Sequence, residues 1–322
     1  MARVAGSEED MHRIDIPETH TEPLASILNN LRLERCGTGR YRGQNLVQIT
    51  GKVYGGQVLG QATMAAADDV QRSLGIGEDE RLAHSITAAF QRAGHLDEPI
   101  EFQVEEINDL RSFSTRNVTA YQGDRLIFTA RVSFQLRQPG PTLASSMPDV
   151  PGPEGLPSSV DFFGALDNVF AKVMSSTNGI DMRRVEGDIY LRPDPSGSPR
   201  QHLWLRARSP MPEGTSRTLQ RAMLGYSADQ FMLEPALRAL GLAWLSRGIS
   251  VATLDHAIWW HRNFDMSEWI LAEMECVSAQ NGRALVNAKF FQDGRRHIAS
   301  MSQEGMVRVP ERHPDHPEQH IE

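Results

Sequence analysis

The stretch from Ala222 to Leu240, AMLGYSADQFMLEPALRAL, decides how the rest of the chain is interpreted. Its small and apolar residues recur at helical spacing, which predicts a helix packed against a core. Asp229 falls in the middle of this apolar stripe. An unpaired carboxylate there would cost several kcal/mol, so we expect Asp229 to have partners or to face a wet cavity. The alternative is that the helix begins later and that Asp229 is an acid in its first turn, where the helix dipole favours it.

Composition excludes several classes of protein. The 322 residues carry a formal net charge of −8 and are 40% hydrophobic, which argues against non-specific nucleic-acid binding and supports a substantial core. The two cysteines, Cys36 and Cys276, are isolated and the histidines are scattered, so we expect no metal site and no disulfide scaffold. No segment is apolar enough for a signal peptide or a bilayer span. We therefore expect a soluble, cytoplasmic protein without membrane insertion, cofactor or nucleic-acid partner.

Hydrophobic periodicity and turn residues divide the chain into five parts. The elements expected in the first half are a helix near Leu24–Leu33, a first strand at Tyr41–Ile49, an alanine-rich helix after Val53, and four strands. Those strands are expected at about 83–91, 100–108, 113–121 and 126–136. The parts are a disordered extension (1–20), a first domain (21–137), a Pro/Gly-rich linker and insertion (138–200), a second domain (201–309) and a disordered tail (310–322). Within the insertion we expect one helix at Val160–Met174, and a strand at His202–Arg208 follows it.

A glycine pair, Gly55–Gly56, opens the alanine-rich helix. Such a pair can cradle a phosphate at a helix start. No Lys-Ser/Thr follows as it would in a P-loop, so we favour close packing against a neighbouring element instead.

An internal repeat relates the two domains. An offset of 170 residues aligns them without a gap and places Gly55 on Gly225, Arg92 on Arg262, Gln122 on Gln292 and Arg125 on Arg295. The pattern of one helix followed by four strands occurs in both copies, and this predicts a tandem duplication with an α+β fold. A long helix wrapped by a curled antiparallel sheet is typical of a hotdog fold, so we expect a double hotdog. Two unrelated α+β domains are the competing architecture.

Three positions break the symmetry of the repeat. Asp229 aligns with Leu59, Thr253 with Ala83, and Gln303 with Ser133, so the second copy has the more polar or longer side chain each time. A carboxylate can accept a proton from water, while a hydroxyl and a carboxamide can hold that water. Such a set suits hydrolysis of an activated ester, such as a thioester, without a metal.

Two other candidate groups are weaker. His84 could be a general base, but its repeat counterpart is Leu254 and no carboxylate is placed to orient it. Asp255 and His256 are adjacent on a strand and therefore point to opposite faces. The chain also lacks a G-x-S-x-G elbow for a serine nucleophile.

The motifs of the chain resemble those of the acyl-CoA thioesterase II (TesB-type) family over about Leu24–Arg308. They are Tyr41-Arg-Gly-Gln44, Val53-Tyr-Gly-Gly-Gln57, Leu224-Gly-Tyr-Ser-Ala-Asp229, Ala252-Thr-Leu-Asp-His256, Trp259-Trp-His-Arg262 and Ser302-Gln-Glu-Gly-Met306. The resemblance implies a double hotdog that hydrolyses acyl-CoA to a fatty acid and CoA. The family's Asp, Ser/Thr and Gln triad carries over to Asp229, Thr253 and Gln303, with no covalent intermediate.

Several further expectations accompany the resemblance. A homodimer or larger homo-oligomer is expected, with a role in fatty acid and lipid metabolism. Substrate-binding candidates are the groups near the helix starts and the aromatic residues, namely His84, Gly56, Gln57, Phe231 and Trp259. Two alternatives stay open: a hotdog hydratase acting on enoyl thioesters, which needs a histidine–carboxylate pair, and a non-catalytic acyl-CoA-binding protein.

Overall fold

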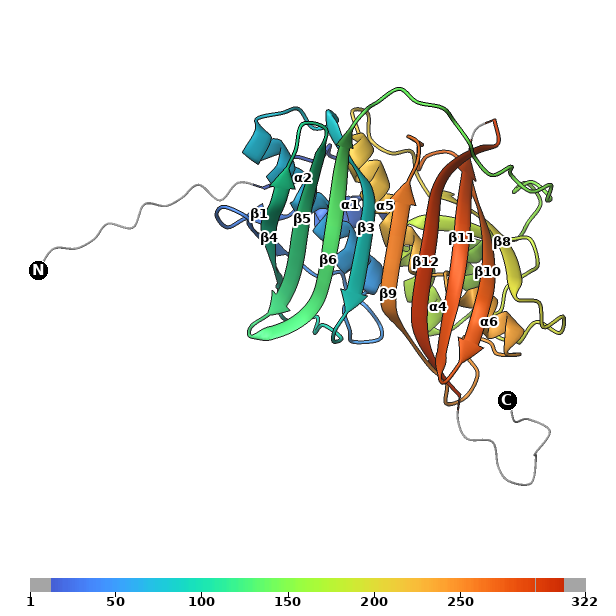
Figure 1. Cartoon of the computed structure of the whole chain (residues 1–322). Helices are drawn as coiled ribbons and strands as arrows, with labels where there is room; N and C mark the ends of the chain where they lie inside the picture. Colours follow the sequence, from blue (N-terminus) through green and yellow to red (C-terminus); the bar gives the residue numbers. More distant parts are fainter. Residues whose placement is uncertain (1–12, 293, 310–322) are drawn as a thin grey trace, which may run out of the picture.

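The computed structural model describes residues 13–292 and 294–309 and contains one twelve-stranded sheet in which every pairing is antiparallel. The strands of the first half are β1 (Glu34–Arg35), β2 (Arg40–Gly43), β3 (Arg81–Phe90), β4 (Ile100–Asp109), β5 (Phe113–Gln122) and β6 (Arg125–Leu136). Those of the second half are β7 (Ile180–Arg184), β8 (Arg200–Ala207), β9 (Ser250–Trp260), β10 (Ile270–Gln280), β11 (Arg283–Gln292) and β12 (Arg296–Arg308). The spatial order is β1-β2-β4-β5-β6-β3-β9-β12-β11-β10-β8-β7, so β3 and β9 join the two halves (Figure 1).

The helices gather on one face of this sheet (Figure 1). They are α1 (Leu24–Leu31), α2 (Gly55–Leu74), α3 (Ser159–Gly164), α4 (Val169–Thr177), α5 (Arg217–Ala228) and α6 (Glu234–Ala239). Helix α2 is lined with alanine and glycine, and it packs directly on α5. None of the described helices is both long and apolar enough to cross a membrane.

The register of β3 on β9 is centred on one residue pair. Thr87 pairs with Ala257, and these positions lie 170 residues apart. The pairs on either side are symmetrical about this centre, because Ser85 pairs with Trp259 and Ala89 with Asp255. The strands predicted after Leu82 are found within two residues of β3, β4, β5, β6 and β8, whereas the first strand predicted at 41–49 is only partly correct, because β2 ends at Gly43. The offset of 170 holds across β3, β4 and β5.

The last strand departs from the predicted gapless alignment by one residue. Ile86 pairs with Val132 in the first half, whereas His256, 170 positions after Ile86, pairs with Gln303. The β11–β12 hairpin is one residue longer than the β5–β6 hairpin, which accounts for the shift. The prediction that Gln303 matches Ser133 is therefore wrong: Gln303 matches the buried Val132, and Arg125 matches Arg296 rather than Arg295.

The helix predicted over Ala222–Leu240 is broken in the structure. Helix α5 already begins at Arg217, so Gly225 lies within the helix and not at its start. The helix ends at Ala228, and Asp229 is its C-cap residue instead of a mid-helix or N-terminal acid. A continuous helix would force the Pro235 ring against the carbonyl of Phe231, so the chain turns before α6 begins.

The predicted linker contains regular structure. Instead of one helix at Val160–Met174 it forms α3 and α4, and β7 adds to the edge of the sheet. Arg184 of β7 forms a buried bidentate ion pair with Glu234 of α6, with N–O distances of 2.6 and 2.7 Å. At the N-terminus, Ile14 and Ile16 are buried in the core, so the predicted disorder is wrong for residues 13–20. The tail 310–322 and residues 1–12 lie outside the described residues.

Candidate active site

The structure brings the three symmetry-breaking residues together in one hydrogen-bonded cluster. The Thr253 hydroxyl donates to Asp229 Oδ1 over 2.8 Å. The Gln303 amide, through Nε2, lies 2.8 Å from Thr253 Oγ1 and 3.2 Å from Asp229 Oδ1. Asp229 comes from the end of α5, Thr253 from the start of β9 and Gln303 from near the end of β12.

A fourth donor reaches Asp229 from the other half of the molecule. Helix α2 begins at Gly55 next to this carboxylate, and the backbone N–H of Gly56 hydrogen-bonds to it. The first N–H groups of a helix have no intrahelical acceptor and favour a negative charge. The site is therefore shared between the halves, with the acid on one and a helix N-terminus on the other.

Burial raises the pKa of Asp229 above its usual range, while hydrogen bonds from Thr253, Gly56 and Gln303 act in the opposite direction. A carboxylate with a raised pKa is a stronger base than an ordinary aspartate, and the three hydrogen-bond donors favour its charged form. This combination suits a group that must take a proton from water.

The glycine pair allows the close approach of the two helices. A Cβ on Gly55 would lie 2.7 Å from Asp229 Oδ2, and a Cβ on Gly56 would clash with the Tyr226 carbonyl oxygen. The prediction that these glycines serve close packing is confirmed. The Tyr54 hydroxyl donates to that same carbonyl, which is one of the last four of α5 and has no partner within the helix.

Gln303 leaves one acceptor free beside Asp229. Its side chain is 1% exposed, and its Oε1 atom is buried without a hydrogen-bond partner among the described residues. A buried orphan carbonyl of this kind is satisfied by a bound water or by a polar ligand. Asp229 and Gln303 Oε1 together offer two acceptors to the hydrogen atoms of one water.

The matching positions of the first half are apolar. Through the registers of the sheet, Thr253 and Gln303 correspond to Ala83 and Val132, and through the offset of 170 residues Asp229 corresponds to Leu59; all three of these counterparts are buried. A Cβ on Gly225 would touch Leu59, just as one on Gly55 would touch Asp229. The hydrogen-bonded cluster is therefore present at one end of the β3–β9 pair and absent from the matching positions at the other.

Two of the predicted substrate-binding residues lie in the elements that form this site. Gln57 follows Gly56 on α2, and its buried side chain accepts from the Leu46 N–H and donates to Asn45 Oδ1, which holds the preceding loop. Phe231 lies in the turn after Asp229, is fully buried and faces Phe290 at 6.5 Å between ring centroids.

Two others lie elsewhere. His84 lines a separate pocket at the opposite end of β3, where its ring contacts Phe113 edge-on. Burial lowers its pKa, and no carboxylate hydrogen-bonds to it among residues 13–292 and 294–309. Trp259 is 42% exposed, next to the buried Ile258 and Trp260 on β9.

Two residues around the cluster were not among the predicted site residues. Tyr54 was quoted only as part of a motif, although its hydroxyl closes the end of α5. His256 is fully buried directly opposite Gln303, and both of its ring nitrogens lack partners in the described part of the chain. Burial lowers the pKa of His256 to about 4, so the ring is neutral at neutral pH and is a weak proton acceptor. The prediction that Asp255 and His256 form no dyad agrees with their burial, because Asp255 is exposed.

Comparison with known families matches most of the chain. A model described as "Acyl-CoA thioesterase" matches residues 183–306, and one described as "Acyl-CoA thioesterase N-terminal domain" matches residues 46–135. The first match contains Asp229, Thr253 and Gln303, and the second contains Gly55 and Gly56.

Individual proteins agree over nearly their whole lengths. The chain is 31% identical to acyl-coenzyme A thioesterase 8 of Homo sapiens, over 87% of this chain and 88% of that protein. It is 32% identical to the crystal structure of an acyl-CoA thioesterase II from Mycobacterium marinum, with a TM-score of 0.69, covering 88% of this chain and 99% of that one. A protein of Alicyclobacillus acidocaldarius described as having a hotdog fold is 16% identical, with a TM-score of 0.69 over 88% and 98% of the chains. These similarities identify the fold as an α+β hotdog.

Proposed function

The chain belongs to the acyl-CoA thioesterase II (TesB-type) family and is a thioester hydrolase, and from this premise we propose that Asp229, Thr253 and Gln303 activate the water that hydrolyses acyl-CoA. The observation that carries the proposal is the hydrogen-bonded cluster of these three side chains at the N-terminus of α2. Free fatty acid and CoA are the products.

In the proposed mechanism one water lies between Asp229 and Gln303 Oε1. Asp229 takes a proton from this water while the oxygen of the water attacks the thioester carbon. Thr253 holds the carboxylate in position. The carbon–sulfur bond then breaks, and the CoA thiolate takes up the proton that Asp229 received. No bond forms between enzyme and acyl group, so the acid returns to its ionised state after each turnover.

The start of α2 supplies the donors for the developing oxyanion. The N–H of Gly56 is bound to Asp229, whereas the N–H groups of Gly55 and Gln57 have no acceptor within the described residues. Backbone donors aimed at a developing negative charge lower the barrier by several kcal/mol in other acyl-transfer enzymes. We assign this role to the N–H of Gln57 or Gly55, which gives Gln57 its place in the site.

We further propose that the chain is a tandem duplicated, double hotdog. The support is the symmetrical β3–β9 register centred on Thr87 and Ala257, together with β-bulges at matching places. In one such pair, β3 bulges between Ala83 and Ser85 and β9 bulges at the matching place, between Thr253 and Asp255. We also propose that the enzyme is cytoplasmic, that it acts in fatty acid and lipid metabolism, and that it forms a homodimer or larger homo-oligomer.

The test is release of free CoA thiol from acyl-CoA esters of increasing chain length. We expect turnover that rises and falls along the series, which gives the acyl preference directly. A single turnover in heavy-oxygen water distinguishes the mechanism: the label should appear in the fatty acid and not in the peptide that contains Asp229. Label in that peptide would replace the water mechanism with a covalent one, and binding without thiol release would leave an acyl-CoA-binding protein.

A further inference from the structure

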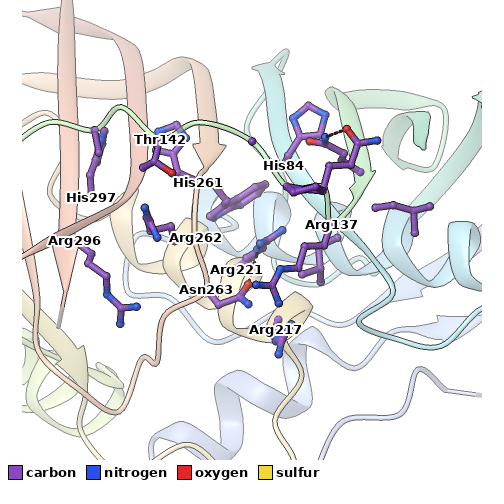
Figure 2. Close-up of a pocket in the computed structure, with 18 of the residues that line it drawn as sticks. His84, Arg137, Thr142, Arg217, Arg221, His261, Arg262, Asn263, Arg296 and His297 are labelled. Atoms are coloured by element: carbon purple, nitrogen blue, oxygen red, sulfur yellow. Dashed lines mark hydrogen bonds between the residues drawn. The ribbon is translucent and has the colours of Figure 1, made fainter. Parts of the chain in front are cut away.

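A pocket lies at the end of the β3–β9 pair opposite the Asp229 cluster, near the N-terminus of α5 (Figure 2). Its volume is about 1370 Å³, which exceeds the roughly 300–1,000 Å³ of common ligand sites. The walls come from the start of β3, the ends of β6 and β9, the first turns of α5 and the linker residues 138–145. None of the three catalytic candidates lines it.

The lining of this pocket is strongly basic. It contains five arginines, Arg137, Arg217, Arg221, Arg262 and Arg296, against only two carboxylates, Asp79 and Glu80. Asp79 is occupied by Arg217, because it accepts from the Arg217 backbone N–H over 3.0 Å and lies 3.7 Å from its Nε atom. Glu80 accepts from the backbone N–H of Gly77. The pocket therefore has cations in excess.

Arg221 is the most unusual of these cations. It is only 6% exposed, and it donates to the Ala83 carbonyl and to Asn263 Oδ1. Its Nε atom is buried without a partner, and no carboxylate forms an ion pair with it in the described part of the chain. Burial lowers its pKa to about 10. A buried guanidinium without a counter-ion is costly, and an anion in the pocket would compensate it.

The repeat explains what kind of anion fits. Three arginines of the pocket have counterparts beside the other end of the β3–β9 pair. Arg296 corresponds to Arg125 through the hairpin registers, and Arg262 corresponds to Arg92, because their backbone N–H groups bind the matching carbonyls of Ile298 and Ile127. Arg137, directly after β6, corresponds to Arg308 at the end of β12. A substrate with CoA as its leaving group brings phosphates to that end, where guanidinium groups are suited to bind them. The far end retains these arginines, while the catalytic positions there hold Leu59, Ala83 and Val132.

We propose that this pocket is a second, non-catalytic site that binds the phosphorylated nucleotide portion of CoA. The inference rests on the proposed thioesterase function, which makes CoA the product. The ligand's phosphates would pair with Arg221 and Arg262. Trp260 supplies a further donor, because it lines the pocket and its Nε1 atom is buried without a partner among the described residues.

The experiment counts bound ligands by calorimetry, using CoA, adenosine 3′,5′-bisphosphate and inorganic phosphate as separate probes. We expect two CoA molecules per wild-type chain. Arg262→Ala should bind the second CoA molecule at least about tenfold more weakly, because the variant lacks the charge-assisted hydrogen bonds of this arginine. Arg262 is a suitable target because its backbone N–H has a partner, whereas no partner of its side chain is found within residues 13–292 and 294–309. Its matched control is Arg92→Ala, which should weaken the other molecule instead.

Three results would overturn the inference. One CoA per wild-type chain removes the second site, and two that are unaffected by Arg262→Ala place it elsewhere. Equal affinity for inorganic phosphate and the nucleotide shows that no nucleotide is recognised. Thiol release measured on the same preparation separates the two proposals. Turnover with a single bound CoA refutes only the second site, whereas two bound CoA molecules without turnover refute only the hydrolase mechanism.

Discussion

At one end of the β3–β9 pair, the structure places a carboxylate, a hydroxyl and an amide within hydrogen-bond distance of one another. At the other end, the corresponding positions hold Leu59, Ala83 and Val132. The strands that carry these residues have nearly the same backbone arrangement in the two halves, including β-bulges at matching places. The chemistry of the two ends therefore depends on a few side chains and on where the helices begin.

Where the helices begin matters as much as the side chains. Helix α2 starts at Gly55, so its free N–H groups face Asp229. Helix α5 starts eight residues earlier than the repeat predicts, at Arg217, and the counterpart of Gly56 is Tyr226 in its interior. The N–H of Tyr226 is used within the helix. An acid at the position of Leu59 would consequently lack the backbone donor that Asp229 has.

The largest expected effect comes from removing the charge at the catalytic end. Asp229→Asn should lower kcat by about 10²–10⁴-fold, the range in which loss of a general base falls. Asparagine is nearly isosteric, so unfolding temperature and acyl-CoA binding serve as controls for folding. If the folded variant turned over substrate as fast as the wild type, the carboxylate that distinguishes the two ends would not be the source of activity.

The break between α5 and α6 has no counterpart in α2. Its stabilisation can be tested at the buried ion pair of Arg184 with Glu234. Glu234→Gln should destabilise the fold by about 3–5 kcal/mol, because it leaves the buried Arg184 without its counter-ion. The free energy of unfolding in urea measures this, with the exposed pair Arg283–Glu304 as control, for which Glu304→Gln should cost below about 1 kcal/mol. Equal costs for the two variants would mean that the buried pair does not hold the break.

The sign of the pH dependence at Glu234 follows from its environment. Burial alone would raise its pKa, but Arg184, Gln201 and Trp244 outweigh burial and lower it. A depressed carboxyl pKa contributes stability that is present above the unfolded-state value and is lost as pH falls through the folded-state value. Acid should therefore weaken the wild type more than Glu234→Gln.

Matched glycines provide the next smaller effect. Gly55→Ala should lower kcat about ten- to hundredfold, because its Cβ would lie 2.7 Å from Asp229 Oδ2 and displace the carboxylate. Gly225→Ala should change kcat less than about threefold, since its Cβ meets only Ile258 and Leu59 at 3.2 and 3.4 Å. Steady-state kinetics on both variants measures the difference. If both substitutions reduced kcat equally, the helix contact would be needed for packing alone.

The smallest effect is a shift in the pH profile. Thr253→Val keeps the shape of the side chain but removes a hydrogen bond that lowers the pKa of Asp229. The pKa should therefore rise further, so that the acid limb of kcat/KM moves to higher pH. Ala83→Val, at the matching position of β3, should leave the limb in place. A limb that moves to lower pH, or does not move, would contradict the role given to Thr253.

Much of this comparison could be predicted from the sequence, because strands leave a period-two pattern and hairpins leave Gly-containing turns. The four strands of each half, and the three residues that break the symmetry, followed from these signals. The one-residue insertion in the β11–β12 hairpin could not, since a gapless match places Gln303 over a neighbouring polar serine. Only the register shows that it replaces the buried Val132.

The sequence does contain a signal for the break between α5 and α6, namely a proline. Pro235 is incompatible with a continuous helix through Phe231, but the apolar periodicity of the stretch outweighed it. The arrangement of the insertion was harder to predict, because β7 is stabilised by the distant ion pair of Arg184 with Glu234. Such contacts depend on packing that local sequence patterns do not contain.

The linker described above lets the two halves change separately. In a symmetric dimer of single domains, one mutation alters both ends of the seam at once, so an acid gained at one end is also imposed on the other. In the duplication that we propose, a single chain that spans β6 to β8 carries two separately encoded copies of each position. The proposal therefore implies that Asp229 and Leu59 diverged within one gene, one half gaining the carboxylate while the other kept the apolar packing.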